Sequence, residues 1–187
     1  MSVTTLDPQT ALVVIDLQKG LAAAPTLDPV PAVTEKAAAL ASAFRQRGLP
    51  VVLVNVAGVA IGRTEHGSHS LQLPPDWTDL LPELNQQAGD IVVTKHTWGA
   101  FAGTGLESLL KSAGVTQIVL AGVATSIGVE STAREAYALG FNVTLAVDAM
   151  TDLSIEAHTN SVTRIFPRLG ETGTTQEIVA LLDQRRV

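Results

Sequence analysis

Nearly continuous apolar runs alternate along the chain with longer segments in which apolar residues recur every three or four positions. Four of these runs, rich in Val, Ile and Leu, span residues 11–15, 51–56, 118–121 and 143–147. Runs of this length and composition are typical of parallel strands covered on both faces. Because they alternate with segments of helical spacing, the pattern predicts an α/β fold with an open parallel sheet between layers of helices.

Three of the intervening segments are predicted to be helices from their apolar spacing and their boundaries. The first carries its apolar positions ahead of Gly48, which ends it, at Val33, Ala37, Leu40, Ala41 and Phe44. The other two, Ile155–Phe166 and Thr174–Leu182, flank a short last strand near Gly170–Thr172. A shorter helix is predicted over Pro75–Leu84, with Trp77 and Leu81 packing inward.

A further strand, residues 90–94, is the third in chain order and is predicted to be buried and to end at Lys95. Thr104 and Glu107 have the spacing of a capping box that begins a helix. The helix after Gly128 is expected to pack through Val129, Ala133, Ala136 and Tyr137, and to turn Arg134 and Glu135 toward solvent or a neighbouring subunit. Asp148, at the end of the run 143–147, is expected to be structural.

Composition narrows the class of protein. The 187 residues are 46% hydrophobic and 16% charged, which predicts one α/β domain over residues 1–187. The net charge of −6 argues against nucleic acid as a partner. With no cysteine, disulfides and thiolate chemistry are excluded. The N-terminal residues show neither a signal peptide nor a membrane span, so a cytoplasmic location is expected.

Candidate chemistry gathers where strands end. Asp16 follows the first run, Lys95 follows the strand at 90–94, and the turn 122–128 follows the run 118–121. In an open parallel sheet the carboxyl ends of strands face a common ligand crevice, so these three features predict an active centre. Taken singly, each has a plainer interpretation: a capping aspartate, a surface lysine and an ordinary strand-to-helix turn.

Three segments carry a resemblance to a known family: VVIDLQKG (13–20), VVTKHTWGAFAGTGLESLL (92–110) and GVATSIGVESTAREA (122–136). Together they resemble the isochorismatase-like, or cysteine hydrolase, superfamily. The resemblance implies a three-layer α/β/α fold with a six-stranded, mostly parallel Rossmann-like sheet in the order 3-2-1-4-5-6. It also implies a cis peptide bond between Val123 and Ala124, proton transfer by Asp16, and Lys95 as its electrostatic partner.

One position departs from the family pattern. Gly128 stands where amide-hydrolysing members have their cysteine nucleophile, so a thiolate mechanism is excluded. Isochorismatases resemble this arrangement, since they keep the Asp and the Lys without the cysteine. The resemblance therefore favours hydrolysis of an isochorismate-like vinyl ether with Asp16 as the acid. Two alternatives stay open: a catalytically impaired relative that binds a small carboxylate, and a water-using hydrolase of another small amide.

The remaining candidates surround these residues. Val123, Ala124 and Gly128 are expected to form an oxyanion-binding turn, and candidate substrate contacts are Gln18, Arg63, Trp98, Phe101 and Thr125. Arg63 could equally be a surface residue, and the two aromatic residues could serve packing alone. Ser126 has no apparent histidine partner and is not expected to be a nucleophile.

No cofactor or metal is expected. The segment Asn55-Val56-Ala57 lacks the Asp-x-His ligand pair of metal-binding relatives, and His66 and His69 are interpreted as solvated loop residues. The predicted partner is a small-molecule substrate, with no membrane partner. The resemblance also suggests a homo-oligomer.

Overall fold

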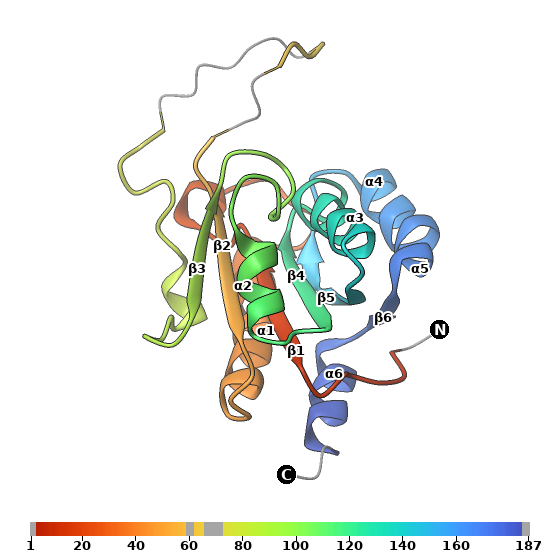
Figure 1. Ribbon diagram of the computed structural model, residues 1–187. Coiled ribbons are helices and arrows are strands. Elements are labelled where there is room, and N and C mark those ends of the chain that lie inside the picture. Colours follow the sequence, from red (N-terminus) through yellow and green to blue (C-terminus); the bar gives the residue numbers. More distant parts are fainter. Residues whose placement is uncertain (1–2, 59–61, 66–72, 185–187) are drawn as a thin grey trace.

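Six strands form one sheet in the order β3-β2-β1-β4-β5-β6 in the computed structural model (Figure 1). Every neighbouring pair of strands is parallel. The structure describes residues 3–58, 62–65 and 73–184. This order confirms the predicted fold class. The strands are β1 (Thr10–Ile15), β2 (Val51–Val56), β3 (Ile91–Lys95), β4 (Gln117–Val123), β5 (Asn142–Thr151) and β6 (Glu171–Gly173).

Helices cover both faces of the sheet and bury two separate apolar clusters (Figure 1). Alternate residues of β1 point to opposite faces, so Leu12 and Val14 join one cluster while Val13 and Ile15 join the other. The first cluster is closed by α1 (Val30–Arg45) and α6 (Thr175–Asp183); the second is closed by α2 (Leu106–Ser112), α3 (Glu130–Ala138) and α5 (Phe166–Leu169).

Helix α4 (Ile155–Asn160) runs through a π-helical turn at Ser161–Ile165 into α5, which matches the helix predicted there. The capping box of α6 is complete, with Thr174 Oγ1 accepting from the Glu177 amide and the Glu177 carboxylate accepting from the Thr174 amide. None of the described helices combines the length and hydrophobicity needed to cross a bilayer.

The strands at the centre of the sheet are buried on both faces, as their composition predicts, but β3 is not. It lies at the edge, where its residues alternate between buried and exposed, and Val92 is 44% exposed. The expectation of a buried strand at this position was wrong because one edge of β3 and much of one face have no neighbouring layer. Lys95 nevertheless ends the strand on its buried side.

Strand β5 is longer than predicted and continues past Asp148 to Thr151. Its pairing with β4 shifts register between Leu120 and Gly122, and such a bulge lets β5 follow the turn that β4 enters. Gly122 has a φ of +121°, and a Cβ there would overlap the Ile15 carbonyl, so only glycine fits. Asp148 Oδ1 accepts from the Thr175 amide at 2.7 Å, which is a structural contact.

Three local predictions were wrong. Residues 75–84 form turns followed by a 3-10 helix at Pro82–Leu84, because Pro82 cannot donate within a helix. Gly105 rather than Thr104 precedes α2, and Glu107 pairs with Lys111 one turn later instead of closing a capping box. Tyr137 is exposed rather than packed.

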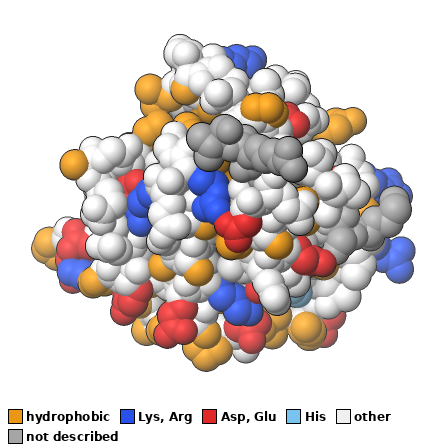
Figure 2. Space-filling view, turned by 90° about the horizontal axis from the view of Figure 1, so that it is seen from below, with side chains coloured by type: hydrophobic (Ala, Val, Ile, Leu, Met, Phe, Trp, Pro, Cys, Tyr) orange, Lys and Arg blue, Asp and Glu red, His pale blue; other side chains and the backbone are white. Residues whose placement is uncertain are grey.

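Loops and helix starts gather at the carboxyl ends of the strands, at the top of Figure 1. The opposite face of the molecule carries the amino ends of the strands. Figure 2 shows acidic and basic side chains intermingled over that face, without a large area of a single sign. The charge pattern of this face therefore singles out no binding surface.

Candidate active site

A pocket of about 230 Å³ opens at the carboxyl ends of β1, β3 and β4. The segment after β1 covers one side of it through Leu21, Ala24 and Thr26. Asp16, Lys95 and Gly128 line this same pocket, so the structure brings together the three features that the sequence placed at strand ends. The crossover order of the sheet is what makes these distant segments neighbours.

Asp16 and Lys95 form a buried ion pair. Lys95 Nζ lies 2.8 Å from Asp16 Oδ2, and the two residues are 2% and 5% exposed, respectively. Lys95 Nζ also donates to the Thr97 carbonyl at 3.1 Å. Asp16 has a φ of +55°, and its left-handed backbone ends β1. Its second oxygen, Oδ1, is buried and has no hydrogen-bond partner among the described residues, which is rare for a carboxylate.

Burial raises the pKa of Asp16 from 3.8 to about 6, although the charge of Lys95 and the hydrogen bond from it both lower this pKa. Desolvation therefore outweighs the pairing with Lys95. A carboxyl group with this pKa is partly protonated near neutral pH, and the protonated form can donate a proton. The site thus contains a candidate general acid.

Gly128 lies directly beside Asp16. It belongs to a π-helical turn, Thr125–Val129, between β4 and α3. A Cβ at Gly128 would lie 3.2 Å from Asp16 Oδ2 and 2.9 Å from Ile15 Cγ2, so a longer side chain would occupy the space next to the carboxyl group. The peptide bond between Val123 and Ala124 is cis, as the resemblance implied, and both residues line the pocket.

Two side chains of α3 hold the loop that follows Lys95. The Phe101 amide donates to Glu135 Oε2 at 2.9 Å, and the Ala100 amide donates to Thr132 Oγ1 at 3.1 Å. Thr132 Oγ1 donates in turn to the Gly128 carbonyl at 2.7 Å. A Cβ at Gly99 would overlap the Glu135 carboxylate, so a larger residue there would displace the Glu135 side chain from its present position.

The expectation that Glu135 faces solvent or another subunit was therefore wrong. Its carboxylate satisfies the backbone of a loop that is 34 residues away in the sequence. Only Arg134 points outward, where it pairs with Glu130 one turn earlier. A glycine after Trp98 was the one sequence signal that could have suggested such a close contact.

Gln18 holds the framework behind the pocket. Its carboxamide nitrogen donates to the carbonyls of Val56 and Trp77 at 3.1 and 2.8 Å, and its oxygen accepts from the Val56 amide at 2.7 Å. The side chain is fully buried and does not line the pocket. Trp77 itself lines the pocket, and its indole Nε1 donates to the Val56 carbonyl at 2.9 Å.

The other sequence candidates occupy different places. Trp98 lines the pocket, whereas Phe101 is buried and stacks on Phe141 with ring centroids 5.8 Å apart. Thr125 is buried beside His158 Nδ1 at 2.9 Å, and its hydroxyl donates to the Thr151 carbonyl. Arg63 is exposed and does not line the pocket.

No group of three or more metal-ligating side chains occurs in residues 3–58, 62–65 and 73–184. His66 and His69 lie outside the described residues.

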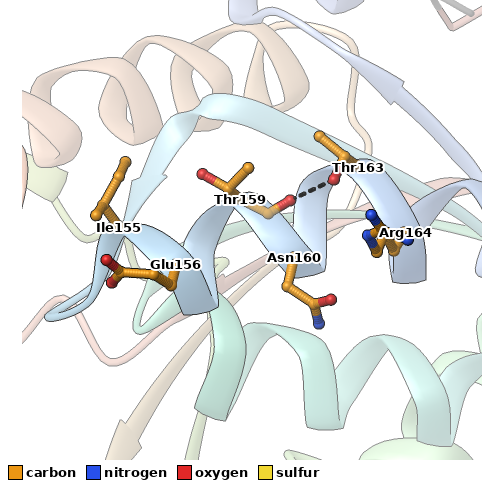
Figure 3. A pocket seen from close by; sticks show the side chains of 6 residues that line it. All are labelled: Ile155, Glu156, Thr159, Asn160, Thr163 and Arg164. Carbon is orange, nitrogen blue, oxygen red and sulfur yellow. Dashed lines mark hydrogen bonds between the residues drawn. The ribbon is translucent and has the colours of Figure 1, made fainter.

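A second hollow, of about 360 Å³, lies on the outer surface of α4 and the π-helical turn that follows (Figure 3). All six residues that line it are exposed: Ile155, Glu156, Thr159, Asn160, Thr163 and Arg164. The hydrogen bond drawn there joins the Thr163 hydroxyl to the Thr159 carbonyl within the same helical segment. Without a buried polar group, this hollow lacks the features of a catalytic site.

Comparisons with known proteins agree on one family. Residues 10–177 match the isochorismatase domain. The isochorismatase family protein YwoC of Bacillus subtilis is 41% identical over 187 residues, covering 96% of this chain and 97% of the relative. YecD of Escherichia coli O157:H7 is 42% identical over 183 residues, covering 92% and 96%.

A solved structure agrees with these relatives. An isochorismatase family protein from Burkholderia thailandensis superposes with a TM-score of 0.94 and 44% identity, covering 98% of this chain and 100% of that one. The match extends over the sheet, both helical layers and the strand ends that form the pocket. On this domain match and these full-length similarities, the chain belongs to the isochorismatase family of hydrolases.

Proposed function

We propose that this protein hydrolyses an isochorismate-like vinyl ether, with Asp16 as the general acid and without an enzyme nucleophile. The observation that carries the proposal is the state of Asp16: buried in the pocket, paired with Lys95 through one oxygen, and without a partner on the other. A protonated Oδ1 would have no acceptor in the protein among the described residues. Asp16 lines the pocket, so a substrate carbon bound there can take its proton.

The reaction begins when Asp16 transfers its proton to the terminal carbon of the enol ether. The ether oxygen stabilises the resulting oxocarbenium ion, and the ionised carboxylate of Asp16 balances its charge. Water adds to the cationic carbon and gives up a proton to Asp16. The hemiketal then collapses: the bond between its carbon and the ether oxygen breaks, and the proton of its hydroxyl ends on the departing oxygen, which releases pyruvate and an alcohol. Asp16 ends the cycle protonated, as it began.

Lys95 and Gly128 have separate roles in this scheme. Lys95 Nζ donates to Asp16 and to the Thr97 carbonyl, which leaves one N–H for the carboxylate of the substrate. Gly128 leaves open the space beside Asp16 Oδ2 that a side chain would fill. That space can admit the attacking water. The absence of cysteine from the chain is compatible with this route because no covalent intermediate is formed.

Hydrolysis of another small amide is the second candidate, and the ionised form of Asp16 favours it. As a base, Asp16 would activate water to attack a carbonyl carbon, and only its deprotonated form would be competent. The two reactions therefore predict opposite responses to pH around the pKa of Asp16. A relative that only binds a small carboxylate would instead be stabilised by the ligand without turning it over.

Pyruvate release tests the proposal. Wild-type protein and Asp16→Asn are incubated with isochorismate and with 2-(cyclohexyloxy)acrylate, a simple enol ether of pyruvate, and pyruvate is followed with lactate dehydrogenase and NADH. We expect release by the wild type from at least one substrate and a loss of at least about 100-fold in the variant. Asp183→Asn, on an exposed position of α6, is the matched control. No release from either substrate by folded wild type would overturn the proposal.

A further inference from the structure

Charged and apolar residues are distributed unevenly over the pocket wall. Asp16 and Lys95 are the only charged residues among the described residues that line it, and two threonines add the other polar side chains. The rest of the wall is apolar or glycine, and its larger side chains include Leu21, Val56, Trp77, Val123, Ile127 and Leu153. One end of the pocket thus holds an acid–base pair, while the remainder offers almost nothing with which a polar group could form a hydrogen bond.

The charge of the site limits the charge of its ligand. When Asp16 is ionised, it and Lys95 form a neutral pair. When Asp16 is protonated, as the proposed reaction requires, Lys95 leaves a single positive charge in the pocket. One substrate carboxylate balances that charge. A second carboxylate would have to lose its hydration against an apolar wall without a cationic partner, which is costly.

The apolar wall also reaches the outside of the molecule. Trp98 and Leu153 both line the pocket although they are 60% and 54% exposed. Their exposure places them at its mouth, whereas Ile127 and Trp77, which also line the pocket, are less exposed. A ligand that fills the pocket and extends toward solvent therefore remains in contact with apolar side chains along its length.

We infer that the site takes a monocarboxylate whose remaining body is apolar. Under the function proposed above, on which this inference rests for its chemistry, the substrate is the enolpyruvyl ether of a small apolar alcohol. Its carboxylate lies against Lys95, its ether lies beside Asp16, and its alcohol portion lies between Trp77, Trp98 and Leu153. A dicarboxylate with a hydroxylated ring, such as isochorismate itself, is a poor fit to this wall.

Binding of three probes that share a six-membered ring tests this inference without turnover. Cyclohexanecarboxylate presents one charge and an apolar body, trans-cyclohexane-1,4-dicarboxylate adds a second charge, and quinate replaces the apolar body with hydroxyl groups. Titration calorimetry at pH 6.5 should give a Kd for cyclohexanecarboxylate at least about tenfold lower than for either of the others, since one unsatisfied charged or polar contact costs more than a tenfold change in affinity. Equal affinities, a preference for the dicarboxylate or quinate, or no binding of any probe would overturn the inference.

A variant locates the binding in this pocket. Trp98→Ala should weaken cyclohexanecarboxylate by about tenfold, because it removes a large apolar surface from the mouth. Tyr137→Ala is the matched control, since Tyr137 is an equally exposed aromatic residue that does not line the pocket. Equal affinity losses in both variants would overturn the assignment to this pocket.

Turnover separates this inference from the proposed function. We expect kcat/KM for pyruvate release from 2-(cyclohexyloxy)acrylate to exceed that from isochorismate by at least about tenfold. Faster hydrolysis of isochorismate would keep the vinyl-ether reaction and overturn the apolar preference. Selective binding of cyclohexanecarboxylate without any pyruvate release would keep the apolar preference and overturn the vinyl-ether reaction.

Discussion

Asp16 illustrates how surroundings change the chemistry of a single side chain. An aspartate that follows an apolar strand is common, and its ordinary pKa would leave it ionised at neutral pH. Here desolvation raises the pKa to about 6 despite the contact with Lys95. The burial comes from the pocket wall and the loop over it, so the acid is a product of the assembled site.

The pH dependence of the reaction follows from this shift. If Asp16 is the acid, only its protonated form is active, so log kcat/KM should be flat below pH about 6 and fall by one per pH unit above it. Stability changes in the same direction. The raised pKa means that the folded state holds this proton more tightly than the unfolded state, so the contribution is present below pH 3.8 and is lost as pH rises through about 6.

Steady-state rates of pyruvate release between pH 5 and 8 check this prediction, with Asp183→Asn expected to follow the wild-type curve. A rate that rises through pH 6 would contradict acid catalysis and would favour amide hydrolysis with Asp16 as the base.

Helix α3 acts on the site as an element, through the loop that it holds. Glu135 and Thr132 accept from the backbone at Phe101 and Ala100, and the same loop supplies the Thr97 carbonyl that accepts from Lys95. These contacts hold the loop that directly follows Lys95 and that accepts a hydrogen bond from it. The ion pair with Asp16 depends on contacts that neither residue makes itself.

Removal of the Glu135 contact should change both the activity and the pKa of Asp16. In Glu135→Ala the Phe101 amide loses its acceptor and the loop loosens, so we expect kcat/KM to fall by about tenfold. The pKa of Asp16 should rise further as Lys95 becomes less well placed, which carboxyl carbon NMR can follow without any substrate. Glu135→Gln should keep most of both properties because its amide oxygen can still accept from Phe101.

Glu107→Ala, which removes an exposed acid from α2, is the control for general effects of the substitution. A loss of stability in Glu135→Ala with an unchanged pKa of Asp16 would show that Glu135 supports the fold without positioning Lys95.

At the scale of the whole molecule, a partly buried ion pair connects α1 to the segment that leads into the edge strand β3. Arg45 of α1 donates through Nε and Nη2 to the two carboxylate oxygens of Asp90, at 3.0 and 2.7 Å. Arg45 Nη2 also donates to the Leu84 carbonyl, and the Asp90 side chain is almost fully buried. These contacts attach the segment before β3 to helix α1.

Asp90→Ala should lower the free energy of unfolding by about 3 kcal/mol, because it leaves the guanidinium without its partner. Urea denaturation measures the change, and Lys111→Ala, which breaks an exposed pair on α2, should cost less than about 0.5 kcal/mol. We expect kcat/KM per folded molecule to stay within about twofold of wild type in Asp90→Ala, since Asp90 lies at the start of β3, away from the pocket. A cost below about 1 kcal/mol would contradict the assigned role of the pair.

The sequence by itself determined the layers of the fold and the positions at which chemistry could occur. Continuous apolar runs specify buried parallel strands because both faces must be covered, and parallel strands bring Asp16, Lys95 and Gly128 to one edge of the sheet. Composition excluded a thiolate nucleophile because the chain contains no cysteine. The resemblance then supplied the strand order and the cis peptide bond, which periodicity does not specify.

Only the tertiary structure decided what each of these residues contacts. Gln18 forms hydrogen bonds with backbone groups up to 59 residues away, and Glu135 accepts one from a loop 34 residues away. No local sequence pattern could therefore predict the partners of these side chains. The burial of Asp16 and the apolar wall of the pocket depend on segments from five parts of the chain. Local propensity describes each segment alone, whereas desolvation and charge pairing arise only when distant segments exclude water together.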